Sequence, residues 1–291
     1  MGSALDCLLT DKDRWDKEFV VMNVERPTGK MLDFVKYLPK NITPQDQPEA
    51  FEYAREMSGY KYPLKWCIDN FWKTPEAVSF HDFYHNSDPN KTLLSVTEYE
   101  GVQRAKQSIL ENDFTNYFFY QIFVHHEIMH QVPIYFTYEG VECKALLDGI
   151  LIDHKDRTIQ PFDLKTTGKS VYDFQDSFLF WGYYRQGAFY ERALYSKQSP
   201  IKDLLKQGYK MLDFIFIVVE SSKDSINPAI IYRTTEKDRH CGINGGWVRG
   251  KFYKGINTLL DDYLFYTKND LWDMPKDLLD SNGEVVLDIF N

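Results

Sequence analysis

The chain has 291 residues, of which 43% are hydrophobic and 16% aromatic, and its formal net charge at pH 7 is −9. This composition is typical of a well-packed globular protein with one large domain or two small ones, and no apolar run is long enough for a membrane span. The N-terminus lacks a basic segment followed by a long apolar core, so we expect no signal peptide.

The four cysteines lie far apart and form no CxxC pair. Such spacing favours reduced thiols, and hence a cytoplasmic protein, over a disulfide framework or a zinc ribbon. The acidic net charge argues against a nucleic-acid partner, but residues 165–254 carry 15 Lys and Arg against 9 Asp and Glu. A local basic surface is what phosphate contacts require, although a solvated charged face explains the same excess.

The first 130 residues read mainly as helix. GSALDCLL predicts an opening helix, residues 18–24 a short strand, and the proline-rich region 26–90 a series of short helices and turns. A helical pattern then runs from 95 to about 130 and is interrupted by a loop at ENDFTN.

The pattern then changes to strands. VPIYFTYEG, VECKALLDGILID and TIQPFDLKTT are rich in β-branched and aromatic residues, and Glu139-Gly140 suits a hairpin turn between the first two. A long aromatic helix (FQDSFLFWGYYRQGAFYERALY), two strands (DFIFIVVES, AIIYRTT), a closing helix (GWVRGKFYKGINTLLDDYLFY) and a loosely attached tail follow. This order predicts an α/β domain with a mixed sheet.

Asp163 and Lys165 are the residues most suggestive of chemistry. At positions i and i+2 of a strand they point to the same side, while Phe162 and Leu164 should face the packed side. A carboxylate and an ammonium on a mostly apolar strand are costly unless paired or bound to a ligand. With Asp148 on the preceding strand, they suit a Mg²⁺ site to which the Leu164 carbonyl adds an oxygen. An ordinary ion pair is the alternative interpretation.

The order of strand–Asp, strand–DLK and helix–QxxxY resembles the PD-(D/E)XK nuclease superfamily, in particular the RecE/RecB-like exodeoxyribonucleases. GSALDCLL resembles the opening helix of the RecE-type nuclease domain, PFDLKTT its D-x-K-T-T strand and GYYRQGAFY its Y-x-x-Q-x-A-x-Y helix. The resemblance covers the first twenty residues and about 95–235. It implies a restriction-endonuclease-like core with a mixed central sheet flanked by helices.

The implied single nuclease domain spans 1–291. Its core comprises 1–24 and 95–267, with a helical insertion at about 26–90 and a C-terminal tail at about 268–291. The resemblance implies that Asp148 and Asp163 hold Mg²⁺ or Mn²⁺, and that Lys165 is the catalytic lysine. Gln186 and Tyr190, one turn apart on a helix, would support the site or contact DNA.

Two positions depart from the family pattern. Asp6 stands where relatives carry a histidine, and it would serve as an additional metal ligand. Gln131 stands where relatives often carry a glutamate. Thr166 and Thr167 would bind a phosphate or cap the end of the strand, or, more simply, reflect strand propensity. These departures keep open a catalytically degenerate nuclease-fold protein that binds DNA or has a structural role.

The resemblance also implies a biological setting. It points to an exonuclease acting on duplex DNA ends in recombination or repair, encoded by a bacterium or a phage and located in the bacterial or infected-host cytoplasm. A homo-oligomeric ring and a single-strand annealing partner protein are implied as well, and a membrane is not. Some relatives hold an iron–sulfur cluster through one early and three late cysteines; this chain has only Cys241 in its later part, so no cluster is expected.

Two further patterns have competing interpretations. HEIMH, at His126–His130, matches the zinc-metalloprotease motif, yet a helix end with surface histidines is favoured because strand-like residues follow at once. The aromatic stripe of the long helix could stack on bases, but we expect most of it to be core. Its members are Phe178, Phe180, Trp181, Tyr183, Tyr184, Phe189 and Tyr190.

Overall fold

The computed structural model describes residues 1–42 and 47–284. The chain folds into two compact units. Unit 1 comprises Met1–Phe119, Leu164–Val171 and Val218–Ile230, and unit 2 comprises Tyr120–Asp163, Tyr172–Ile217 and Ile231–Asn291. The boundary therefore passes through strand β5, between Asp163 and Leu164.

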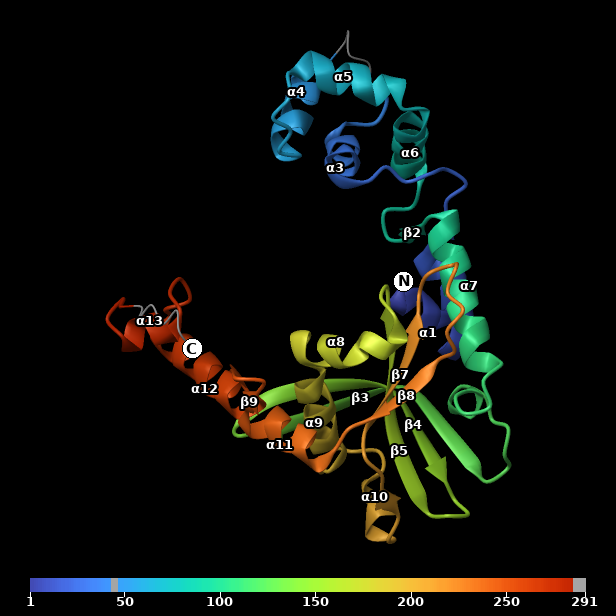
Figure 1. Ribbon diagram of the computed structural model, residues 1–291, viewed down its shortest axis with the longest axis vertical. Helices are drawn as coiled ribbons and strands as arrows, with labels where there is room; N and C mark the ends of the chain where they lie inside the picture. Colours follow the sequence, from blue (N-terminus) through green and yellow to red (C-terminus); the bar gives the residue numbers. More distant parts are fainter. Residues whose placement is uncertain (43–46, 285–291) are drawn as a thin grey trace. The chain divides into compact units, whose positions relative to one another are not determined.

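Unit 2 contains most of a mixed sheet with the strand order β3-β4-β5-β7-β8, in which β6 pairs with β5 in parallel (Figure 1). Strands β3, β4 and β5 are antiparallel neighbours. The strands are β3 (His126–Tyr138), β4 (Val141–Asp153), β5 (Thr158–Thr167), β6 (Lys210–Met211), β7 (Ile215–Glu220) and β8 (Ile230–Arg233). The predicted mixed sheet is confirmed.

The hairpin between β3 and β4 closes as the sequence predicts. Glu139 and Gly140 both have positive φ, 46° and 81°, and Tyr138 pairs with Val141 on either side of them. Two consecutive residues with positive φ form the type I′ turn, whose twist matches that of the flanking strands. The same register relates the two strands from this turn to the pair His126–Asp153 at their other end.

The predicted long aromatic helix is in fact two helices, α8 (Phe174–Phe180) and α9 (Tyr183–Leu194). The break lies at Gly182, whose φ of 72° is a left-handed conformation that glycine adopts without steric cost. The expectation that the aromatic residues are mostly core holds for Tyr184, which is buried. It is wrong for Phe180 and Trp181, which are exposed next to the break.

Helix α9 packs on β3, β4 and helix α11 (Glu236–Asn244). The approach to α11 is close, since a Cβ added at Gly242 would lie 2.4 Å from the carbonyl oxygen of Tyr184. Helix α11 was not predicted, because its sequence EKDRHCGIN shows little apolar periodicity. A capping box between Thr235 and Asp238 fixes its first turn.

The segment predicted as one closing helix begins with a hairpin. Strands β9 (Gly246–Val248) and β10 (Lys251–Tyr253) pair across Arg249 and Gly250, which both have positive φ. Helix α12 (Ile256–Asn269) follows, and the tail holds α13 (Lys276–Asp280), with residues 285–291 outside the described part. Unit 2 also contains the short helix α10 (Lys202–Lys206).

Unit 1 begins with helix α1 (Gly2–Thr10), as predicted, and the strand predicted at 18–24 is the three-residue β1 (Phe19–Val21). Its other elements include α7, which packs on α1. They are η1 (Lys12–Arg14), α2 (Trp15–Glu18), β2 (Thr92–Leu94), α7 (Val96–Leu110) and η2 (Asn116–Phe118). Strand β2 pairs with β1 in parallel. The short 3-10 helix η3 (Val171–Asp173) begins at Val171, the last residue of this unit's second segment.

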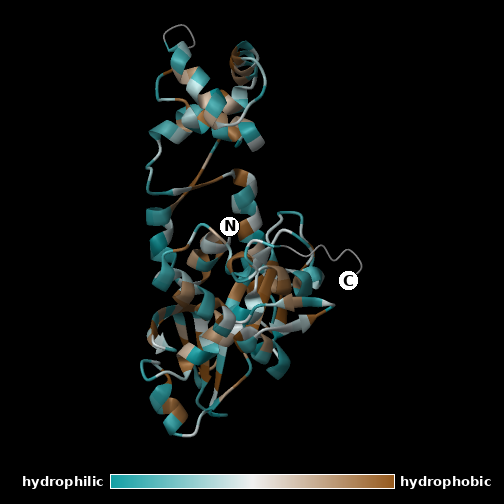
Figure 2. Cartoon of the chain, turned by 90° about the vertical axis from the view of Figure 1, so that its left-hand side faces the viewer, coloured by the Kyte–Doolittle hydropathy of each residue, from teal (hydrophilic) through white to brown (hydrophobic). Residues whose placement is uncertain are grey.

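The predicted region of short helices consists of α3 (Gly29–Tyr37), α4 (Pro48–Met57), α5 (Leu64–Lys73) and α6 (Pro75–Asn86). Four phenylalanines meet in its core, namely Phe34, Phe51, Phe71 and Phe80, all fully buried. Hydrophobic and hydrophilic residues alternate along these helices (Figure 2), as expected of helices that bury one face. This part of unit 1 thus has a hydrophobic core of its own.

The helix predicted at 117–130 is wrong beyond its first residues. Only η2 is helical, and strand β3 begins at His126. The aromatic run before it gave no clear period, and pairing with β4 decides the outcome for the following residues. Over the described residues, no helix is both long enough and apolar enough to cross a membrane, and all four cysteines have free thiols.

Candidate active-site residues on strands β4 and β5 and helix α9

Asp163 is the most deeply buried acidic side chain among the predicted site residues, with 2% of its surface exposed. It lies on β5 directly after the fully buried Phe162. The side-chain amide of Gln186 on α9 donates a hydrogen bond of 2.8 Å to Oδ1 of Asp163, and the same nitrogen lies 3.1 Å from the Tyr190 hydroxyl. The structure thus brings together three of the predicted residues within unit 2.

Asp148 lies on the neighbouring strand of unit 2, one step beyond the pair Gly149–Phe162. Asp163 is likewise one step beyond that pair, which is the last one of the β4–β5 ladder, and the same register continued by one residue would set the two aspartates opposite each other. Cross-strand neighbours have Cβ atoms about 4.5–5.5 Å apart. The Phe162 ring covers Gly149 so closely that an added Cβ would lie 2.0 Å from Cζ of the ring. A larger residue at position 149 would therefore displace the ring beside both aspartates.

His130 adds a second constraint on Asp148. Its imidazole is hydrogen-bonded to the backbone of Asp148, and its ring packs edge-on to Phe162 with 6.3 Å between centroids. Burial lowers the pKa of His130, and the backbone hydrogen bond only partly opposes that shift. Gln131, where relatives often carry a glutamate, has a φ of 49°, a conformation in which few non-glycine residues are found.

Helix α9 is held in place by a partly buried ion pair. Glu191 lies 3.5 Å from Arg239 of α11 and accepts a hydrogen bond of 3.2 Å from the backbone N–H of Phe214. Burial raises the pKa of Glu191, and the charge of Arg239 works in the opposite direction. These contacts fix the helix that presents Gln186 and Tyr190.

The remaining predicted residues belong to unit 1. Leu164 is buried and Lys165 is half-buried at the end of β5, and a Cβ added at Gly2 would lie 3.4 Å from Oγ1 of Thr166. Gly2 and Asp6 lie one turn apart on α1, so Asp6 is on the helix face that looks toward the end of β5. The Thr10 hydroxyl donates to the Asp6 carbonyl at 2.8 Å and lies 3.5 Å from its Oδ1.

Thr167 ends the strand by capping it. Its hydroxyl accepts a hydrogen bond of 3.0 Å from the Lys169 N–H, and its carbonyl accepts one of 2.9 Å from the Ser221 N–H. Next to it, Glu220 accepts hydrogen bonds from Val171 N–H (2.9 Å), Asn227 (2.7 Å) and Ser225. Of the two threonines, Thr167 therefore caps the end of the strand.

The HEIMH sequence lies on strand β3 and not on a helix. The metalloprotease motif needs two histidines one helical turn apart, whereas four residues of strand span about 13 Å. His126 and His130 therefore cannot share one zinc ion, and the metalloprotease interpretation is wrong.

A different group of metal-ligating side chains was missed. His125, His126 and Asp153 lie at the end of the β3–β4 pair remote from its turn, with ligand atoms all within 4.8 Å of one another. The adjacent histidines were visible in the sequence, but Asp153 becomes their neighbour only through the strand register.

Part of the predicted basic excess is already engaged. In unit 2, Arg239 pairs with Asp213 at 2.6 Å, Arg249 with Asp176 at 3.2 Å and Lys254 with Asp262 at 3.1 Å. These three side chains therefore contribute less positive charge to the surface than the sequence count suggests.

Comparison with known proteins adds little. The sequence matches no profile of a known protein family, and no curated protein matches it significantly. Among solved structures, one that matches is a crystal structure from Eubacterium rectale named for a presumed exonuclease activity, with 12% sequence identity and a TM-score of 0.39 over 97% of this chain and 96% of that one. At this identity and TM-score, the likeness shows neither the fold nor the function of this chain.

Proposed function

We propose that this chain is a metal-dependent DNA exonuclease of the PD-(D/E)XK kind, similar to the RecE/RecB-like enzymes. The observation that carries the proposal is the buried carboxylate of Asp163, which Gln186 holds by a hydrogen bond of 2.8 Å. Asp148 follows on the neighbouring strand by the same register, and Lys165 follows two residues later on β5. Burying a carboxylate in a sheet is costly, which favours a functional reason for it.

The donor set fits Mg²⁺ or Mn²⁺. Two carboxylates and the Leu164 carbonyl are hard oxygen ligands, which these ions prefer over nitrogen or sulfur. The resemblance of the opening helix to that of the RecE-type nuclease domain suggests Asp6 as a further carboxylate ligand. When bound, the ion would lower the pKa of a water molecule and neutralise negative charge on the phosphate.

The chain's own residues have separate roles in this proposal. The Gln186 amide fixes one oxygen of Asp163 by its hydrogen bond. Because the carboxyl group is planar, the direction of the other oxygen is then fixed as well. Lys165 provides an ammonium that donates hydrogen bonds to a phosphate oxygen or orients the attacking water. Tyr190 positions Gln186 through the contact of 3.1 Å between its hydroxyl and the amide nitrogen.

The finer features of the proposal come from the resemblance of the sequence motifs. They are action at duplex DNA ends, a role in recombination or repair, a phage or bacterial source, a ring of identical subunits and a single-strand annealing partner. A second candidate function is DNA binding without catalysis, which the aspartate at position 6 and the glutamine at position 131 favour.

The test is digestion of end-labelled linear duplex DNA in Mg²⁺, beside a covalently closed circle of the same sequence. We expect the wild type to degrade the linear DNA and to spare the circle. Asp163→Ala and Lys165→Ala should abolish degradation, whereas Lys169→Ala, an exposed lysine four residues further along, should not. Folded wild-type protein that degrades neither substrate in Mg²⁺ or Mn²⁺, yet binds DNA, would support the non-catalytic candidate.

A further inference from the structure

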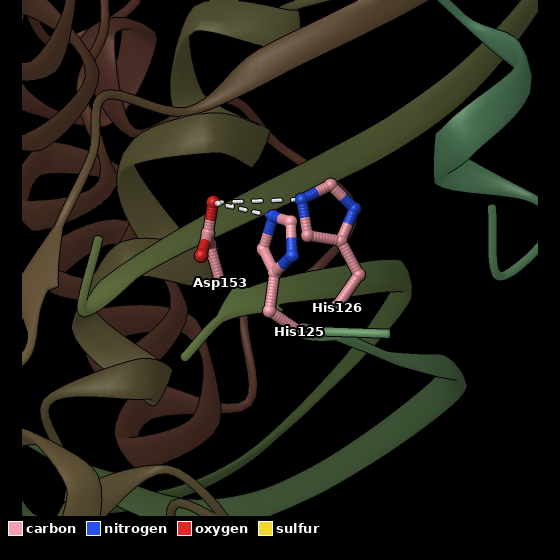
Figure 3. A group of neighbouring side chains, drawn as sticks. All are labelled: His125, His126 and Asp153. Carbon is pink, nitrogen blue, oxygen red and sulfur yellow. Dashed lines mark ion pairs between the residues drawn. The ribbon is translucent and has the colours of Figure 1, made fainter. Parts of the chain in front are cut away.

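Three side chains converge at the end of the β3–β4 pair that lies farthest from its turn. The imidazoles of His125 and His126 both direct a nitrogen toward the carboxylate of Asp153 (Figure 3). Nε2 of His125 lies 3.8 Å from Oδ2 of Asp153, and Nε2 of His126 lies 3.5 Å from the same oxygen. The three ligand atoms all lie within 4.8 Å of one another.

The distances from the two histidine nitrogens to the Asp153 oxygen are more typical of ligands that share one metal ion than of hydrogen bonds. A hydrogen bond between a ring nitrogen and a carboxylate oxygen would be about 2.7–3.2 Å long. Two ligands at about 2.0–2.2 Å from one tetrahedral zinc ion are about 3.3–3.5 Å apart. The observed distances of 3.5 and 3.8 Å are close to that second spacing.

The backbone explains why two consecutive histidines point to one side. His126 is the first residue of β3 and pairs with Asp153, the last residue of β4. His125 precedes the strand in a turn closed by the His126 N–H to Phe123 carbonyl bond of 3.1 Å, so the alternation of a strand does not govern its direction. The His154 N–H also donates a hydrogen bond of 2.9 Å to the His125 carbonyl oxygen.

The carboxylate of Asp153 is oriented by its other oxygen. Oδ1 accepts hydrogen bonds from the N–H groups of Lys155 (2.8 Å) and Asp156 (3.0 Å), which directs Oδ2 toward the histidines. Such outer hydrogen bonds are typical of groups that hold a ligand in metal sites. The Phe123 ring packs against both imidazoles, at 5.5 Å from His125 and 4.9 Å from His126.

The exposure of the group leaves room for a fourth ligand. The side chains of His126 and Asp153 are 9% and 17% exposed, whereas that of His125 is 36% exposed. Solvent thus reaches the group from one side, where a water molecule would complete a four-coordinate ion. Two imidazoles and one carboxylate suit Zn²⁺ or a similar transition metal, and two nitrogen ligands are unfavourable for Mg²⁺.

The geometry points to a zinc site formed by His125, His126 and Asp153, separate from the proposed Mg²⁺ ligands. Asp148 lies five residues before Asp153 on β4, which corresponds to about 16 Å of strand. A bound ion would tie the turn before β3 to the end of β4 and so stabilise the end of the sheet hairpin. This inference does not depend on the proposed nuclease activity.

The test is a zinc titration of the full chain in millimolar Mg²⁺, with bound zinc counted by elemental analysis after gel filtration. The wild type should bind one Zn²⁺ per chain, and its melting temperature should rise by about 2–4 °C. Co²⁺ substituted for Zn²⁺ should give the visible absorption of a four-coordinate site. His126→Ala, His125→Gln and Asp153→Asn should each lose the zinc and the shift in melting temperature.

The controls separate this site from other zinc ligands. Asp153→Asn keeps an oxygen that accepts the Lys155 and Asp156 N–H groups, so loss of zinc without loss of the fold is expected. Asp163→Ala and His240→Ala, an exposed histidine on α11, should bind zinc as the wild type does. The inference is overturned by a wild type that binds no zinc, by variants of the three ligands that retain it, or by its loss in Asp163→Ala.

Discussion

The Gln186 amide on helix α9 donates a hydrogen bond of 2.8 Å to Oδ1 of Asp163 on strand β5. This contact joins β5, which carries the DLK motif, to α9, which carries the QxxxY motif. It also fixes the orientation of a carboxylate that is almost fully buried. A buried carboxyl group that loses a hydrogen-bond donor becomes less favourable in the folded state.

Gln186→Ala should therefore reduce both stability and the proposed nuclease activity. We expect the free energy of unfolding to fall by about 1–3 kcal/mol and the rate of DNA hydrolysis to fall about tenfold or more. Urea unfolding and a DNA digestion assay measure the two effects. Gln175→Ala, at an exposed position of α8, is the matched control and should change neither. Unaltered stability in Gln186→Ala would mean that the hydrogen bond does not hold Asp163.

Gly149→Ala should destabilise the sheet next to the aspartates. The added methyl group would lie 2.0 Å from the Phe162 ring, so the ring must move, at a cost of about 1–3 kcal/mol. Gly168→Ala is the control, because a Cβ there meets no atom within 4 Å. Thermal unfolding compares the variants, and Phe162→Leu should recover part of the loss by making room. Equal stability of Gly149→Ala and Gly168→Ala would contradict this packing.

The sequence predicts the parts of the fold that local patterns determine. The strand with Asp163 and Lys165 and the hairpin turn at Glu139-Gly140 follow from alternation and turn chemistry. The start of helix α9 could be predicted only by recognising Gly182, the glycine within the aromatic run, as a break in the helix. Pairing between distant strands could not be predicted from local sequence patterns. Strand β3 begins at His126 because the residues from there on pair with β4, and only that register makes Asp153 a neighbour of the histidines.

Glu220 should stabilise unit 1 in a pH-dependent way. Burial alone would raise the pKa of Glu220, but hydrogen bonds from Ser225, Asn227 and the Val171 N–H outweigh it and lower the pKa below its usual value. A lowered pKa in the folded state adds stability above the unfolded-state pKa of about 4.3, and this contribution disappears as the pH falls through the folded-state pKa.

Glu220→Gln is accordingly expected to lower the free energy of unfolding at pH 7 by about 1–3 kcal/mol. The difference from the wild type should shrink as the pH falls below about 4. Urea unfolding over a pH series measures it, with the exposed Glu111→Gln as control. A difference that is constant across the series would show that the charge of Glu220 contributes nothing.

Trp181 is exposed to 65% at the break between α8 and α9, although the aromatic stripe was expected to be mostly core. Stacking of one base on an aromatic ring contributes about 1–3 kcal/mol. Trp181→Ala should therefore weaken binding of single-stranded DNA about 5- to 150-fold, as measured by fluorescence anisotropy, with no change in melting temperature. Trp272→Ala, another exposed tryptophan, should leave binding unaltered. Equal effects of the two substitutions would exclude a specific role for Trp181.

The central claim is that Asp148 and Asp163 act as one catalytic centre for DNA hydrolysis. Its most direct test is the single-turnover hydrolysis rate in Mg²⁺ for Asp148→Asn, Asp163→Asn and the double variant. Residues that act as a unit are strongly non-additive, so each single substitution should lower the rate by about 10³-fold and the double variant should be no slower than either. Folded single variants that keep wild-type rates, or losses that multiply in the double variant, would contradict the account.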